Sequence, residues 1–173
     1  MRTAPYNKLM PFPKSTHRRG FLKRTSIVAS ALSFPFVSSN NILGANQRLN
    51  VAAIGAGGKG GVDIGYCDQE NVVALCDADT RQAAGSQKKF PKARLYQDFR
   101  VMLEKEQHRI DAVTISTPDH THAHPAVMAM RLGKHVYCQK PLTHTVEEAR
   151  LLTRVARETG VVTQMGNQGH AQS

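Results

Sequence analysis

From Leu49 onward, short apolar runs rich in β-branched residues alternate with stretches of helical periodicity. Such alternation predicts parallel βαβ units, because each crossover helix packs its apolar face on a sheet that is buried on both sides. Strands are expected at residues 49–54, 72–77, 93–96, 111–116, 135–138 and 161–165, of which 93–96 is the weakest. The pattern therefore predicts an α/β fold, a doubly wound parallel sheet with the strand order 3-2-1-4-5-6.

Helical segments fit between these strands. They are expected after the glycine-rich stretch that follows the first strand, and over segments that begin at 80, 99, about 125 and 146. The last two should end before Gly133 and Gly160, because glycine readily adopts the left-handed conformation that terminates helices. Thr145 and Glu148 form a Thr-x-x-Glu capping box, so the helix from residue 146 is the best defined.

Basic charge is concentrated at the start of the chain. The net charge is +10, but residues 1–50 hold eight Lys and Arg residues and no acid, which leaves only +2 for the remainder. A nucleic-acid-binding domain would spread its basic residues over a folded face, with aromatic side chains among them. The distribution disfavours nucleic acid as a partner and indicates an N-terminal leader.

The leader, expected over residues 1–46, has the layout of an export signal. A basic region up to Arg24 precedes an apolar stretch at 27–37 and then a small, polar stretch. The apolar stretch is interrupted by Pro35 and is shorter than the roughly 20 residues that cross a bilayer, so no stable membrane anchor is expected. Cleavage after Ser39 or near Ala45 would release the rest of the chain.

The basic region HRRGFLKR resembles the twin-arginine translocation motif, Ser/Thr-Arg-Arg-x-Phe-Leu-Lys. The matching residues are Arg18, Arg19, Phe21, Leu22 and Lys23, with His17 where Ser or Thr is usual. An ordinary basic signal or an arm without fixed structure is the alternative. The resemblance implies the twin-arginine export machinery as a partner, folding before export, and a periplasmic or other extracytoplasmic location. Proteins that use this route often hold a cytoplasmic cofactor.

A glycine-rich stretch follows the first predicted strand and opens a helix. Gly55, Gly57 and Gly60 have the G-x-G-x-x-G spacing of a Rossmann dinucleotide site. The first glycine allows the tight turn, the second lets the backbone approach a pyrophosphate, and the third lets the helix pack on the strand. A purely structural turn is the alternative, but the strand-to-helix context favours dinucleotide binding.

The cofactor is expected to be NAD, with NADP disfavoured. Asp77 ends the second strand twenty residues after Gly57, where a carboxylate accepts hydrogen bonds from a ribose 2′-hydroxyl. The same carboxylate repels the 2′-phosphate of NADP. Lys59, counted among the cofactor-binding residues, and Arg81 would soften this preference.

The segment STPDHTHAHP follows the fourth strand, at the edge of the sheet where ligands bind in such folds. Thr117 and Pro118 are expected to shape a turn beside the nicotinamide, and His122 to help start the next helix. A metal site at His120, His122 and His124 is the alternative. Alternating histidines on a loop lack the ligand spacing typical of zinc, so no metal site is predicted.

The segment YCQKPLTHT follows the fifth strand and places Lys140 at the same edge. A lysine in a partly dry cofactor cleft loses solvation, which favours its neutral form and allows proton transfer near neutral pH. The alternative is a solvated lysine at the end of a strand. The residue pattern alone leaves both interpretations open.

Four segments together resemble one known family. AIGAGGKG, STPDHTH, GKHVYCQKPLTHTVEEA and QMGNQGH occur in the order and spacing of the glucose-fructose oxidoreductase, inositol dehydrogenase and rhizopine-catabolism (Gfo/Idh/MocA) family. The match covers about residues 49–170 and corresponds to the N-terminal, NAD(P)-binding half of that family. It implies a dinucleotide-dependent oxidoreductase of sugars or polyols.

In that family a Glu-Lys-Pro tripeptide supplies a lysine near the nicotinamide, and Lys140 occupies its place. The resemblance implies that Lys140 assists proton transfer as hydride moves to or from the nicotinamide. Gln139, expected at the cofactor site, stands where the family has Glu and removes a negative neighbour of the lysine. The bond between Lys140 and Pro141 is expected to be cis.

The family also has a second α/β domain, which binds substrate, supplies further catalytic residues and usually forms the oligomer interface. The resemblance implies a leader at 1–46, a Rossmann domain at 47–167 and only the start of the link to that second domain at 168–173. We therefore expect a truncated chain with an exposed apolar surface, and homo-oligomers among full-length relatives. An NAD-dependent glycoside hydrolase resembling α-N-acetylgalactosaminidases, or a nucleotide-binding module without catalysis, are the alternative functions.

Overall fold

The computed structural model describes residues 48–168, so the prediction for the leader, and that for the link at 168–173 except its first residue, fall outside the described residues. Six parallel strands form one sheet with the order β3-β2-β1-β4-β5-β6, which confirms the predicted topology. The strands are β1 (Asn50–Ile54), β2 (Asn71–Cys76), β3 (Arg94–Tyr96), β4 (Ala112–Ile115), β5 (His135–Gln139) and β6 (Thr163–Gly166).

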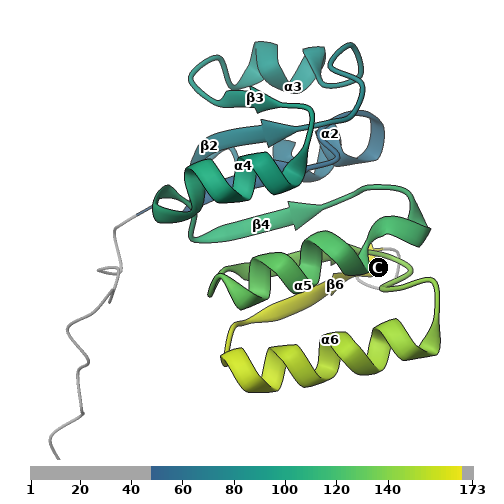
Figure 1. Cartoon of the computed structure of the whole chain (residues 1–173). Coiled ribbons are helices and arrows are strands. Elements are labelled where there is room, and N and C mark those ends of the chain that lie inside the picture. Colours follow the sequence, from purple (N-terminus) through teal and green to yellow (C-terminus); the bar gives the residue numbers. More distant parts are fainter. Residues whose placement is uncertain (1–47, 169–173) are drawn as a thin grey trace, which may run out of the picture. The chain divides into compact units, whose positions relative to one another are not determined.

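Helices lie on both faces of the sheet (Figure 1). One face carries α2 (Gly58–Gly65) and α3 (Ala84–Lys89), and the other carries α4 (Phe99–Glu106), α5 (Ala123–Arg131) and α6 (Val146–Thr159). Short 3₁₀ turns, η1 (Gln107–Arg109) and η2 (Asp119–Thr121), precede β4 and α5. None of the described helices combines the length and apolar character needed to cross a membrane.

The core follows the alternation of side chains along the strands. In β1, Ala52 and Ile54 pack into the apolar cluster beneath α4 and α5, whereas Val51 and Ala53 pack into the cluster beneath α2 and α3. A strand that is apolar on both faces is typical of the interior of a parallel sheet. Because β1 is packed on both sides, it anchors the start of the glycine-rich loop that follows it.

Local signals set most helix boundaries. The capping box at the start of α6 is present, since Thr145 Oγ1 accepts a hydrogen bond from the Glu148 N–H at 3.2 Å and Glu148 Oε2 accepts one from the Thr145 N–H at 3.0 Å. The helix expected from residue 80 begins at Ala84, because residues 80–83 form a turn. The helix expected near Pro125 begins at Ala123, since proline is tolerated in a first turn.

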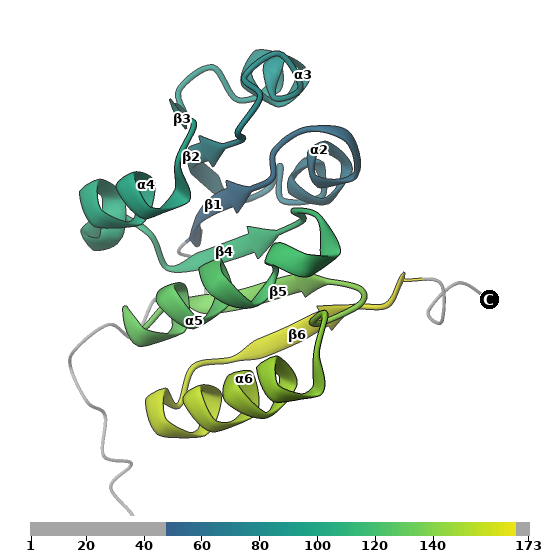
Figure 2. The same cartoon turned by 45° about the vertical axis from the view of Figure 1, so that its right-hand side comes forward.

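All strands point toward the same edge of the sheet (Figure 2). The loops that follow β1, β2, β4 and β5 therefore come together there. These loops carry the glycine-rich stretch and the predicted polar segments.

The glycine-rich loop is packed tightly against the loop after β4. Gly55 has a φ of +80°, a left-handed conformation that favours glycine, and a Cβ there would lie 2.6 Å from the Ser116 carbonyl oxygen. A Cβ on Gly60 would overlap the carbonyl oxygen of Gly55. The first and third glycines of the motif are thus required by the approach of α2 to the sheet.

Replacing Gly60 with alanine should destabilise the domain, because the new methyl group has no room beside the Gly55 carbonyl. We expect a loss of about 2 to 3 kcal/mol in the free energy of unfolding, measured by chemical denaturation. Gly85→Ala is the matched control, because nothing lies within 4 Å of a Cβ at that helical position. It should leave stability unchanged or raise it by up to about 1 kcal/mol. Equal stability of the two variants would contradict this packing.

Candidate functional site

The start of α2 faces the edge of the sheet where the loops meet. Gly57 is the N-cap of this helix, and a Cβ there would lie 2.6 Å from Gln82 Cβ in the turn after β2. The first N–H groups of any helix lack intrahelical partners and, together with the helix dipole, bind phosphate groups. Gly55, Gly57 and Gly60 lie at or beside this helix start, and pyrophosphate binding there stays a prediction.

Asp77, directly after β2, organises the neighbouring turn. Its Oδ2 accepts a hydrogen bond from the Gly57 N–H at 2.9 Å, and its Oδ1 accepts one from the Asp79 N–H at 3.0 Å. Each carboxylate oxygen has a second lone pair, so Asp77 can hold the loop and still accept a bond from a ribose hydroxyl. The sequence motif did not indicate this structural role.

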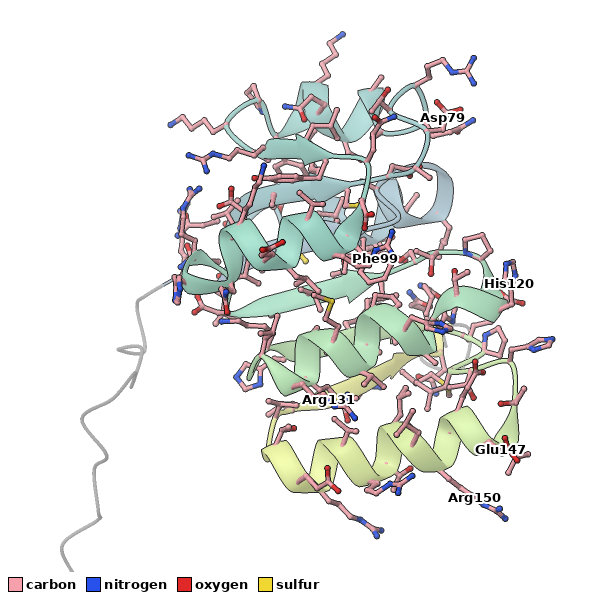
Figure 3. All side chains as sticks on the ribbon, viewed as in Figure 1. Asp79, Phe99, His120, Arg131, Glu147 and Arg150 are labelled. Carbon is pink, nitrogen blue, oxygen red and sulfur yellow. The ribbon has the colours of Figure 1, made fainter. Side chains whose placement is uncertain are left out.

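The two basic residues expected near the ribose are both paired with acids. Lys59 Nζ lies 2.7 Å from Asp63 Oδ1, and this hydrogen bond raises the pKa of Lys59. Arg81 donates to both oxygens of Asp79, each at 2.9 Å, and this pairing lowers the pKa of Asp79. Asp79 lies in the loop region after β2 (Figure 3). The pairing reduces the attraction that either cation offers to a 2′-phosphate.

His122 connects the loops that follow β4 and β5. Its ring is 1% exposed, with Nε2 2.8 Å from the Thr117 carbonyl oxygen and Nδ1 2.7 Å from the Pro141 carbonyl oxygen. Both partners are acceptors, so a ring nitrogen that carries a proton donates to the carbonyl oxygen that it faces. The ring thereby holds the turn at Thr117 and Pro118 against the Lys140 turn.

The position predicted for His122, at the start of the helix after β4, is confirmed. His122 is the N-cap residue, but its side chain makes no capping hydrogen bond because both ring nitrogens contact carbonyl groups elsewhere. His120 and His124 are exposed, and His120 projects outward from the η2 turn (Figure 3). Within residues 48–168, no three His, Cys, Asp or Glu side chains are grouped so as to hold a metal ion.

Lys140 lies in the turn directly after β5. The Lys140–Pro141 peptide bond is cis, as the sequence predicts. The Lys140 N–H donates to Gln139 Oε1 at 3.1 Å, while the side chain of Lys140 is exposed. The described protein residues alone do not surround the ammonium group, so its place in a partly dry cleft stays a prediction.

The sequence motifs did not single out Asp63, which is the most enclosed acid at this edge. Its side chain is 2% exposed. Four groups donate to its carboxylate: Lys59 Nζ at 2.7 Å, Ser116 Oγ at 2.7 Å, Gln139 Nε2 at 2.8 Å and Gln168 Nε2 at 3.3 Å. A signal was available, because position 63 is one helical turn after Gly60 and so lies on the same, sheet-facing side of α2.

The α2 side of β4, β5 and β6 carries no helix among residues 48–168. An apolar hollow of about 400 Å³ lies there, with Val51, Val136 and Tyr137 in its lining. Tyr66 and Val162, which also line it, are 78% and 68% exposed. The buried hydroxyl of Thr114 at the hollow has no hydrogen-bond partner within the described part of the chain. Parallel sheets are ordinarily covered on both faces, so this face is suited to further contact.

Curated relatives resemble this chain over its Rossmann part. The inositol 2-dehydrogenase of Rubrobacter xylanophilus is 31% identical over 121 residues, and the D-glucoside 3-dehydrogenase of Escherichia coli is 34% identical over 121 residues. Each match covers 68% of this chain and 34% of the relative. The chain therefore spans about a third of the length of the curated relatives that it matches.

Solved structures give the same result. GenD2 from gentamicin A biosynthesis, in complex with NAD, is 29% identical with a TM-score of 0.63, and the match covers 69% of this chain and 34% of GenD2. The scyllo-inositol dehydrogenase of Lactobacillus casei, with bound NAD(H) and scyllo-inositol, is 20% identical with a TM-score of 0.67, and the match covers 73% of this chain and 38% of that protein. The second likeness concerns the fold alone.

A sequence model of the oxidoreductase family described as having an NAD-binding Rossmann fold matches residues 49–167. This range coincides with the described sheet and its helices, and it contains the glycine-rich loop, Asp77 and Lys140. The chain belongs to the Gfo/Idh/MocA oxidoreductase family, and residues 49–167 form its NAD-binding Rossmann domain.

Proposed function

We propose that this chain is the cofactor-binding part of an NAD-dependent oxidoreductase that acts on a hydroxyl group of a sugar or polyol. The observation that carries the proposal is the meeting, at one edge of the sheet, of the glycine-rich loop, Asp77 and the Lys140 turn. The names of two relatives, an inositol 2-dehydrogenase and a D-glucoside 3-dehydrogenase, support the substrate class.

Apart from Lys59, which pairs with Asp63, each predicted residue has a role in this proposal. The glycine-rich loop and the start of α2 hold the pyrophosphate, and Asp77 accepts a hydrogen bond from the adenosine ribose. Thr117, Pro118 and Gln139 shape the wall beside the nicotinamide, with His122 fixing the two loops to each other. Nicotinamide supplies the hydride acceptor or donor.

Lys140 carries the proton-transfer step. In the oxidative direction, the neutral amine of Lys140 takes the proton of the substrate hydroxyl while the hydride leaves the same carbon, and a carbonyl group forms. In the reductive direction, the carbonyl carbon receives the hydride and its oxygen receives the proton from Lys140. Because Lys140 is exposed in the described residues, we propose that bound cofactor and a further protein wall remove water from its surroundings.

We also propose that the chain prefers NAD to NADP, because the Asp77 carboxylate repels a 2′-phosphate and both nearby basic residues are paired with acids. Calorimetry should give the lower dissociation constant for NAD. Asp77→Asn keeps an acceptor oxygen for the Gly57 N–H, gives up the bond from the Asp79 N–H and removes the charge, so it should reduce the NAD/NADP preference about ten-fold. Glu104→Gln, on the exposed side of α4, is the control. Tighter NADP binding by the parent, or an unchanged preference in Asp77→Asn, would refute the assignment.

Catalysis is proposed to need residues beyond the 173 of this chain, because hydride transfer requires the substrate to be held within about 3.5 Å of the nicotinamide. The chain alone should bind cofactor but show no turnover with inositol, glucose or amino-sugar glycosides. Joining residues 48–168 to the second half of the Rubrobacter xylanophilus relative should restore hydride transfer. Lys140→Met should then lower kcat at least about 100-fold and leave NAD binding within a few fold.

Lys105→Met, at an exposed position of α4, is the control for that experiment. Accumulation of NADH supports the dehydrogenase, whereas glycoside cleavage without NADH supports the hydrolase alternative. Turnover by the isolated chain, or full activity of the joined protein with Lys140→Met, would overturn the proposal.

Export by the twin-arginine machinery is proposed from the motif around Arg18 and Arg19. A fluorescent reporter that folds in the cytoplasm should reach the periplasm when it is fused to residues 1–46. Changing both Arg18 and Arg19 to lysine should stop this transfer, whereas Arg24→Lys, outside the pair, should not. Undiminished export of the double variant, measured by cell fractionation, would rule out the twin-arginine route.

A further inference from the structure

The carboxylate of Asp63 joins three segments that meet at the cofactor edge. Its Oδ1 accepts from Lys59 of the same helix, and its Oδ2 accepts from Ser116 Oγ after β4 and from Gln139 Nε2 at the end of β5, at 2.7 and 2.8 Å. A neutral carboxylic acid would have to donate one hydrogen bond, whereas an ionised carboxylate accepts only. The surroundings of Asp63 consist of donors, which fits the ionised form.

Gln139 carries this contact onward to the Lys140 turn. The residue is 4% exposed, and while its Nε2 donates to Asp63, its Oε1 accepts the hydrogen bond from the Lys140 N–H. An amide can make both bonds at once because it has a donor end and an acceptor end. A carboxylate at position 139 has no donor to offer to Asp63.

We propose, on the basis of the function proposed above, that Asp63 is a positioning residue of the cofactor site. Its buried carboxylate aligns α2, the loop at Ser116 and, through Gln139, the Lys140 turn. Position 139 therefore accepts an amide and rejects a carboxylate while residue 63 is Asp. This pairing gives a physical reason for the departure of Gln139 from the Glu-Lys-Pro pattern.

The charged and titratable groups around Asp63 determine whether a second carboxylate, at position 139, would be stabilised there. Lys59 faces it from α2 but is half exposed, and Tyr137 of β5 has a pKa raised by burial and then by the charge of Asp63. Cys67, two residues beyond the end of α2, has a pKa raised by burial first and then by the charges of Glu70 and Asp63. Ser116 and Gln168 are uncharged donors. Among residues 48–168, Lys59 alone pairs with this carboxylate as a cation, so a glutamate side chain at position 139 would leave the cluster with excess negative charge.

The test uses Gln139→Glu in the full chain, with NAD affinity measured by calorimetry between pH 5.5 and 8.5. In the variant, the carboxyl groups of Glu at position 139 and Asp63 lie in contact, and two such groups favour sharing one proton. The aligned site should therefore bind a proton that the unfolded or misaligned chain releases. NAD affinity should be reduced at least ten-fold at pH 8.5 and should recover as the pH falls. The parent, measured in parallel, gives the ordinary pH dependence.

The decisive variant reverses the pair. Asp63→Asn combined with Gln139→Glu restores one donor and one acceptor, now with the amide on α2, and should bring NAD affinity back to within about three-fold of the parent at both ends of the pH range. Gln107→Glu, in η1 away from the site, should behave as the parent. A general loss of packing would not be repaired by the reversed pair and would not depend on pH.

Thermal unfolding over the same pH range keeps this test separate from the proposed function. If the parent fails to bind NAD, the proposed function fails, while the pH-dependent stability of Gln139→Glu relative to the reversed pair still reports the Asp63 contact. Parent-like affinity and stability of Gln139→Glu at pH 8.5, or a reversed pair no better than Gln139→Glu, would overturn the role of Asp63.

Discussion

The close approach of α2 to the ends of β1 and β4 is the constraint on which the rest of this structure depends. Gly60 lies against the Gly55 carbonyl with no space for a side chain, so the helix sits nearer the sheet than any other residue type would allow. Two contacts follow from that position. The Gly57 N–H reaches Asp77, and Asp63, further along the same helix, reaches Ser116 and Gln139. A backbone fit thus determines where two carboxylates of the site lie.

Features that depend on short stretches of sequence could be predicted. The strand order is that of the doubly wound fold predicted from alternating strands and helices with a glycine-rich first loop, and the capping box at Thr145 and Glu148 is a four-residue signal. The glycine motif likewise lies within a few residues of one strand. The start of α3, at Ala84, lies later than the predicted residue 80 because the Asp79–Arg81 pair stabilises a turn that competes with the helix.

Contacts between distant segments could not be predicted in the same way. Asp63 and Gln139 are 76 residues apart in the chain, and His122 meets Pro141 across 19 residues. Each contact depends on side-chain directions that only the packed sheet fixes. From the sequence, Gln139 in place of the family's Glu indicated only the loss of a negative charge beside Lys140. The structure instead shows that the Gln139 amide contacts another carboxylate, that of Asp63.

The Asp63 cluster also links the cofactor edge to the uncovered face of the sheet. Asp63, Tyr137 and Gln168 line the apolar hollow, and Gln168 Nε2 donates both to Tyr137 Oη at 2.6 Å and to Asp63. A protein surface that covered the hollow would remove water from these same groups and strengthen the hydrogen bonds between them. Asp63 and Gln139 also align the Lys140 turn. The hydrogen bonds of Asp63 would therefore be strengthened both when a protein surface covers the hollow and when the cofactor edge becomes ordered. Linkage then requires that each event favour the other.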